Sequence, residues 1–158
     1  RSGMNGLGPP ACGGCNMNSL HLFRTVADLA SPTGRWPEAV HPRTLGGCMG
    51  DGEHAWAAAE WVLMVRNSFV REEGNKLILG SGIFPSWYRK KEPISLGPAP
   101  TPFGEVTVRI TPGNRGLEVA WDGSWSRSPP AVEVSVPGFD SVLTGPDQRS
   151  VTLTWRSE

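Results

Sequence analysis

The chain is organised around residues 36–61, which read WPEAVHPRTLGGCMGDGEHAWAAAEW. This stretch opens on Glu38, held between a proline and an alanine, and passes through a loop rich in glycine. It ends in an alanine-rich segment that predicts the start of a helix. Most of the side chains that can carry chemistry lie here, so we interpret the segments on either side mainly as scaffold.

Two helices are predicted around this stretch. Residues 16–31 place apolar side chains at helical spacing before a proline and a glycine end the pattern. Residues 51–72 form the second predicted helix, with Asp51 as its N-cap and Glu53 in its first turn, where negative charge is favoured. Residues 32–50 are predicted to form a long loop, a feature that is usually functional or disordered in compact domains.

The apolar pattern changes from helical to alternating after residue 76, which predicts strands. Residues 77–79 are a short, fully apolar run, and alternating runs cover residues 106–110, 117–121, 132–136 and 151–155. Turns are predicted at residues 112–114, 122–123, 137–138 and 145–147. Short strands at this spacing are typical of an antiparallel β-sandwich. We therefore predict an α+β fold. An N-terminal helical hairpin occupies residues 1–80, and an antiparallel β-sandwich with a proline-rich joint occupies residues 81–158.

The composition limits the classes of partner. Fifteen basic residues balance fifteen acidic ones among 158 residues, so no charge excess favours nucleic acid or a membrane surface. No apolar run approaches the ~20 residues that cross a bilayer. Three cysteines are an odd count, which argues against a disulfide framework and predicts a cytoplasmic protein.

The cysteines leave three interpretations open, and we favour plain thiols over a redox pair or part of a zinc site. Cys12 and Cys15 form a Cys-x-x-Cys pair, which can be redox-active or supply half of a zinc site, with Cys48 as a third ligand and a histidine as a fourth. No second Cys-x-x-Cys follows, so we predict no metal site and no cofactor. Cys12, Cys15 and Cys48 remain the weak candidates for metal ligands.

Two segments carry a resemblance to a known family. Trp-Pro-Glu at 36–38, followed by Gly-Cys-Met-Gly-Asp-Gly-Glu-His-Ala-Trp-Ala-Ala-Ala-Glu-Trp at 47–61, resembles the last hairpin of six-hairpin, (α/α)6-barrel glycosidases. That group includes glucoamylases, glycogen-debranching glucosidases and disaccharide phosphorylases. Leu-Gly-Pro-Ala-Pro-Thr-Pro-Phe-Gly at 96–104 and the strands after it resemble the β-sandwich that follows the barrel in some of these enzymes.

The resemblance implies a carbohydrate-active hydrolase that cleaves glycosidic bonds by acid–base hydrolysis. Glu38 matches the general base, and Trp36, His54 and Trp56 match positions near the sugar-binding floor. His54 follows a glutamate where the family commonly has glutamine or serine. The family's general acid lies on an earlier hairpin that this sequence lacks, so the resemblance implies the C-terminal part of a larger enzyme or a small descendant of one.

Glycoside hydrolysis needs two carboxyl groups, ~5–5.5 Å apart in retaining enzymes and ~6.5–9.5 Å apart in inverting ones. Asp51, Glu53 and Glu60 are the nearby carboxylates, and we take Asp51 or Glu53 as the candidate partner of Glu38. Capping and the helix dipole also explain Asp51 and Glu53, and the polar side of the helix explains Glu60. His41 and Arg43 are candidate substrate-binding residues in the long loop. For His41 we favour the alternative interpretation, an exposed loop histidine.

Seven tryptophans are present, and flat aromatic rings can stack on sugars. Trp36 and Trp125 are predicted to lie in loops and to be binding rings. We expect core packing for the tryptophans on predicted helices and strands. These are Trp56, Trp61, Trp121 and Trp155.

A non-catalytic function competes with the hydrolase. The chain would then be a carbohydrate-binding module, or a module for oligomerisation or interaction. Two helices cannot close a barrel, so their apolar sides predict either a homo-oligomer or a missing N-terminal helical region.

Overall fold

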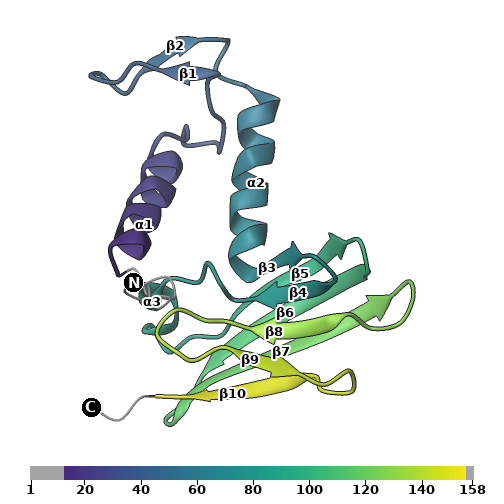
Figure 1. Ribbon diagram of the computed structural model, residues 1–158. Coiled ribbons are helices and arrows are strands. Elements are labelled where there is room, and N and C mark those ends of the chain that lie inside the picture. Colours follow the sequence, from purple (N-terminus) through teal and green to yellow (C-terminus); the bar gives the residue numbers. More distant parts are fainter. Residues whose placement is uncertain (1–12, 156–158) are drawn as a thin grey trace, which may run out of the picture. The chain divides into compact units, whose positions relative to one another are not determined.

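The computed structural model describes residues 13–155, and these residues form an α+β protein (Figure 1). The predicted fold class is confirmed at this level. Close contacts divide the chain into two compact units, Arg1–Trp61 and Val62–Glu158. This division falls inside the second helix, earlier in the chain than the boundary near residue 80 that the sequence predicts.

The first unit contains two helical segments and a small sheet. Its elements are α1 (Gly13–Asp28), β1 (Ala39–Val40), β2 (Gly47–Met49) and the first turns of α2 (Ala55–Phe69). The two short strands pair antiparallel within the segment that the sequence predicts as loop.

The predicted N-terminal helical hairpin is wrong in this form. The two helices meet where the Phe23 and Trp61 ring centroids lie 4.8 Å apart, but they do not form a clear hairpin. The segment between them is not a tight turn, because its own backbone groups pair with one another. The His41 N–H, for example, donates to the Gly46 carbonyl over 2.9 Å.

The second unit is built on two four-stranded sheets that face one another (Figure 1). The antiparallel sheet has the order β10-β7-β6-β5 and comprises β5 (Ile94–Thr101), β6 (Gly104–Pro112), β7 (Gly116–Trp125) and β10 (Ser150–Thr154). The other sheet has the order β3-β4-β8-β9 and comprises β3 (Val70–Glu73), β4 (Lys76–Leu79), β8 (Ala131–Val134) and β9 (Val142–Thr144). A short helix, α3 (Pro85–Tyr88), lies between β4 and β5 in sequence.

The second of these sheets is mixed, which corrects the prediction of a purely antiparallel sandwich. Strands β4 and β8 run parallel, whereas β3–β4 and β8–β9 are antiparallel. The chain leaves this sheet after β4, builds β5, β6 and β7, and then returns beside β4 in the same direction. Parallel neighbours need such a long connection, which the alternating pattern of each strand does not reveal.

Both sheets supply one hydrophobic core. Along β6, Val106, Val108 and Ile110 are at most 1% exposed, and Arg109 between them is exposed. This two-residue alternation is the signal that predicts the strand, and it places every second side chain in the core. Leu77, Leu79 and Val134 face the core from the other sheet.

The second helix ends at Phe69, not at residue 72 as predicted, because the next residues pair as β3 with β4. Val70 lies opposite Leu79 in this ladder, and neither side chain is exposed. Gly74 makes the tight turn between the strands at a φ of +59°, a conformation that favours glycine.

Two further local features differ from the sequence pattern. The proline-rich joint, residues 81–103, contains the whole of β5, which tolerates its prolines because it is an edge strand of its sheet. Asp122 and Gly123 are not a turn but lie inside β7. A Cβ at Gly123 would approach the Trp125 ring to 2.0 Å, so this glycine lets the indole cover the strand.

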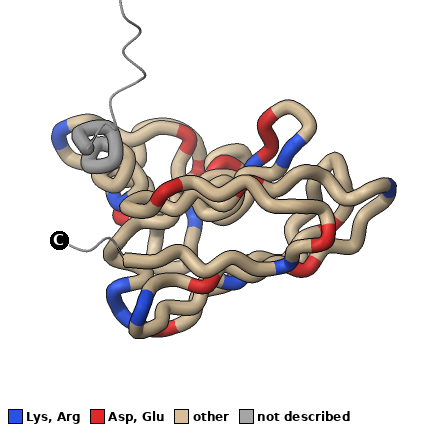
Figure 2. The backbone as a smooth tube through the Cα atoms, turned by 60° about the horizontal axis from the view of Figure 1, so that its bottom comes forward, with Lys and Arg blue, Asp and Glu red and all other residues tan. Residues whose placement is uncertain are grey.

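Charged residues of both signs are interspersed along the described backbone (Figure 2). This distribution agrees with the equal numbers of acidic and basic residues in the sequence. Among the described helices, none is both long and apolar enough to cross a membrane.

Candidate functional site

Two segments on either side of residues 39–48 lie side by side in the first unit, and we call these segments, residues 34–38 and 49–54, the site loops. The Glu38 N–H donates to the Met49 carbonyl over 3.1 Å, and the His54 N–H donates to the Trp36 carbonyl over 2.8 Å. This pairing gathers five of the predicted site residues on neighbouring backbone. They are Trp36, Glu38, Asp51, Glu53 and His54.

Trp36 anchors the first of these segments and is not the exposed ring that its loop position predicts. Its side chain is buried, with 8% exposure. The indole N–H donates to the Val26 carbonyl in the last turn of α1 over 2.8 Å. The Trp36 ring also packs on Trp61, with centroids 5.7 Å apart. Carbonyls at a helix end lack helical partners, so a nearby indole donor is drawn to them.

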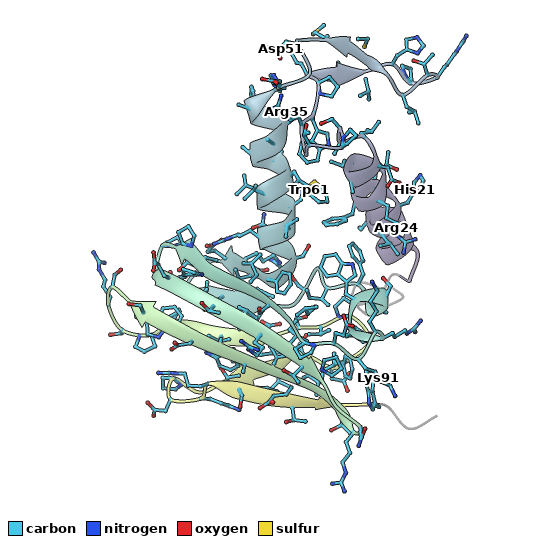
Figure 3. All side chains as sticks on the ribbon, turned by 180° about the vertical axis from the view of Figure 1, so that it is seen from behind. His21, Arg24, Arg35, Asp51, Trp61 and Lys91 are labelled. Carbon is cyan, nitrogen blue, oxygen red and sulfur yellow. The ribbon has the colours of Figure 1, made fainter. Side chains whose placement is uncertain are left out.

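Asp51 and Glu53 are both engaged with neighbouring groups. Asp51 Oδ1 accepts the Glu53 backbone N–H over 2.9 Å. Because α2 begins at Ala55, Asp51 caps the turn before the helix instead of the helix itself. The Glu53 carboxylate forms an ion pair with Arg35, whose position is labelled in Figure 3. Both side chains are more than half exposed, so solvent weakens this pair.

Glu38 is exposed and has no ion pair with another described residue. Its side chain lies against Gly50, where an added Cβ would be 3.3 Å from Glu38 Cβ and 3.8 Å from Glu38 Oε2. Gly50 also has a φ of +75°, so two constraints favour glycine beside this carboxylate. Of the three acids, Glu38 has the carboxylate most available to water or to a ligand.

Two pockets flank the site loops. The smaller has a volume of ≈ 190 Å³, and its lining includes Trp36, Glu53 and His54 together with Arg35. The larger, of ≈ 480 Å³, lies between the end of α1 and the β1–β2 region and is lined in part by Asp28 and Arg35. Its size falls in the usual range of ~300–1,000 Å³ for small-molecule sites. Glu38 lines neither pocket.

Arg35 is a site residue that the sequence reasoning missed. It lines both pockets and carries the ion pair to Glu53. The two residues are separated by 18 positions, so no local spacing links them. Its place directly before Trp36 is the only sequence signal that could have drawn attention to it.

His41 and Arg43 lie on the exposed connection between β1 and β2, and neither lines these pockets. His41 Nδ1 accepts the backbone N–H groups of Arg43 and Thr44, each over 3.3 Å. This geometry gives the histidine a role in holding its own turn, which agrees with the interpretation of an exposed loop histidine.

Trp56 is 71% exposed, although its place on a helix predicts burial. Its indole N–H donates to Glu60 Oε1 over 3.3 Å, one turn along the helix. The partly buried side of α2 runs through Ala57, Ala58 and Trp61, so Trp56 lies off that side. Of the two predicted binding rings in the first unit, Trp56 therefore presents its face to solvent and Trp36 does not.

The candidate metal ligands give no cluster within residues 13–155. Cys48 is an exposed free thiol. Cys12 lies outside the described residues, and only the backbone of Cys15 is described, as part of α1. No group of three or more His, Cys, Asp or Glu side chains in the described part of the chain could hold a metal ion.

Comparison of the chain with models of known families, with curated proteins and with solved structures gave no significant match. The chemistry of the site loops therefore rests on their own residues and contacts.

Proposed function

We propose that this chain supplies the general-base loop of a carbohydrate-active hydrolase that cleaves glycosidic bonds. The pairing of the two site loops carries the proposal, because it brings Glu38 onto backbone that neighbours Asp51 and Glu53. Glycosidases work with two carboxyl groups less than ~10 Å apart. Neighbouring backbone is the arrangement that allows such spacing.

The three acids contact different groups, which supports different roles for them in the site. The Glu38 carboxylate is exposed and unpaired among the described residues, so it can accept a proton from an attacking water. Glu53 is held by Arg35, and Asp51 holds the turn, so both are better suited to shape the site than to act as the base.

Aromatic and polar groups near the acids suit a sugar. The ≈ 190 Å³ pocket joins Trp36, His54 and Arg35, and imidazole and guanidinium groups can bond sugar hydroxyls. The exposed ring of Trp56, in the first turn of α2 and two residues after His54, offers a flat face. Flat aromatic faces contribute apolar contact area in such sites.

The site needs walls from elsewhere, because Glu38 lies open to solvent. Large apolar side chains are exposed on the same unit, including Leu22 at 62%, Leu45 at 59% and Trp56 at 71%. Exposed apolar groups of this kind mark surfaces that other protein segments cover. A second copy of the chain or further helices would cover them and supply the general acid.

The alternative is a non-catalytic module that binds carbohydrate or joins copies of the protein. The openness of Glu38, which lines neither pocket, favours this alternative. A hydrolase would lose bond cleavage when the Glu38 charge is removed. A binding module would cleave nothing, and its affinity for sugar would not change.

The test compares Glu38→Gln with Glu118→Gln, a change at an exposed glutamate on β7 in the other unit. The natural full-length protein and the two variants are each incubated with a panel of aryl glycosides and oligosaccharides. Released sugar is measured, and binding of the same sugars is measured in parallel. We expect Glu38→Gln to lower hydrolysis by about 100-fold or more, as for loss of a general base, and Glu118→Gln to leave it unchanged. Equal hydrolysis by the two variants would remove Glu38 from the mechanism. Sugar binding without hydrolysis would favour the module.

A further inference from the structure

A further pocket lies wholly within the second unit. It has a volume of ≈ 330 Å³ and forms where the end of α3, the β6–β7 turn and the end of β10 meet. Its lining includes Tyr88, Arg89, Lys91, Asn114 and Trp155. Lys91 marks this end of the sheets in Figure 3.

A rigid aromatic platform forms one wall of this pocket. The sequence predicts Trp155 in the core, but its ring is 39% exposed. The Trp155 ring packs on the rings of Phe139 and Tyr88, at centroid distances of 5.0 and 5.9 Å. Tyr88 is itself fixed, since its hydroxyl donates to the Pro137 carbonyl over 3.2 Å. The indole is therefore held before any ligand arrives, which lowers the entropy cost of stacking on it.

Two cations that have no acidic partner among residues 13–155 form the rim. Arg89 and Lys91 are exposed, and neither has an ion pair with another described residue. Four other basic side chains in the described chain are paired with carboxylates, among them Arg66 and Lys76. Lys91 also has a φ of +59°, a strained conformation for a lysine, and the turn keeps it in place through a bond from the Lys91 N–H to the Tyr88 carbonyl.

These features together describe a ligand with a flat face, hydroxyl groups and negative charge. The exposed indole accepts a flat ring, the two cations attract an anionic group, and the Asn114 amide can both donate to and accept from hydroxyls. The volume is near the lower end of the ~300–1,000 Å³ typical of small-molecule sites, which favours a small ligand.

We propose that this pocket binds a short saccharide that carries a carboxylate or a phosphate. Trp155 stacks on a sugar ring, Arg89 and Lys91 hold the anionic group, and Asn114 bonds the hydroxyls. The site goes beyond the proposed hydrolase and does not depend on it, because none of its residues belongs to the site loops.

The test measures binding to the natural full-length protein by NMR titration, following the indole N–H signals, and by calorimetry. The probes are a uronic-acid disaccharide, a hexose phosphate, a neutral disaccharide and adenosine monophosphate. The first two distinguish a carboxylate from a phosphate as the anionic group. At least one of them is expected to bind about tenfold more tightly than the neutral sugar, a difference of ~1.4 kcal/mol, and to weaken as salt is added.

Lys91→Gln is the main variant, and Lys90→Gln is its matched control, since Lys90 is an exposed neighbour that does not line the pocket. We expect Lys91→Gln to weaken binding of the charged sugar about tenfold, or ~1.4 kcal/mol, and Lys90→Gln to leave it unchanged. Trp155→Phe should weaken both charged and neutral sugars. Glu38→Gln should have no effect here, so failure of the hydrolase proposal and failure of this one can be told apart.

Four results would overturn the assignment. Equal affinity for charged and neutral disaccharides would remove the role of the cations, as would equal effects of Lys91→Gln and Lys90→Gln. Tighter binding of adenosine monophosphate than of either charged sugar would replace a saccharide by a nucleotide. Absence of any shift in the Trp155 indole signal would show that no ligand stacks there.

Discussion

Replacing Trp36 by phenylalanine removes the indole N–H that reaches α1 but keeps an aromatic ring at the position. The Val26 carbonyl then loses its donor, because the next available backbone N–H, that of Ala30, already donates to Ala27. A partly buried carbonyl without a partner costs ~1–3 kcal/mol. The smaller ring also leaves some space beside Trp61, which adds up to ~1 kcal/mol. The expected loss of stability in the first unit is therefore about 2 kcal/mol.

The His54 amide reports this loss directly, because its N–H donates to the Trp36 carbonyl. A loss of about 2 kcal/mol raises the open population roughly 30-fold, since 1.4 kcal/mol corresponds to a factor of ten. Hydrogen exchange at His54, followed by NMR, is expected to accelerate by that factor.

Trp56→Phe is the control for this prediction. That ring is 71% exposed, and its bond to Glu60 lies at the surface. Surface changes of this kind stay within ~0.5 kcal/mol, so exchange at His54 should change by about twofold at most. If Trp36→Phe accelerates exchange no more than Trp56→Phe does, the Trp36 indole does not anchor the site loop and our reasoning about it is refuted.

Two further predictions concern the second unit. The hydrogen bond and charge of Arg66 hold the pKa of Glu72 below its ordinary value. The pair therefore stabilises the fold fully at pH values above the ordinary pKa, and this contribution is lost as the pH falls through the lowered pKa. Arg66→Met should lower the free energy of unfolding by ~2 kcal/mol at neutral pH, less than for a fully buried pair. It should also weaken the fall of this free energy at acid pH, measured by urea unfolding. An acid dependence identical to that of the wild type would contradict this role. Gly116→Ala would place a Cβ 1.8 Å from the Leu153 carbonyl oxygen, across the β7–β10 ladder, whereas Gly113→Ala meets nothing closer than 3.6 Å. We expect the first change to cost about 3 kcal/mol or more in thermal unfolding and the second to be nearly neutral, and equal melting temperatures would disprove the close approach.

The local pattern predicted the strands well where one side of a strand is buried. Val106, Val108 and Ile110 alternate with polar residues, and burial follows that alternation. The same reasoning failed at the end of α2, because the helical spacing of Val65, Phe69 and Val70 continues into the first residue of β3. Pairing with β4, a contact made by the next segment of chain, decided the end of that helix.

The candidate site was predicted in part. The sequence drew attention to Glu38, Glu53 and His54, which the structure places on paired backbone. The expected exposures of Trp36 and Trp56 were reversed, since the loop ring is buried and the helix ring is open. Burial depends on which segment lies over a side chain, and that information is not contained in the residue's own neighbourhood.

The sequence by itself determined the α+β class, the positions of the main helices and strands, and the concentration of acids and tryptophans in one stretch. These features follow from local spacing, because a helix or strand imposes its own period on apolar residues. Only the tertiary structure decided the parallel β4–β8 pair, the Arg35–Glu53 ion pair and the open aromatic face of Trp155. Each of these joins or exposes residues distant in the chain, and such contacts depend on how whole segments pack, which no local pattern records.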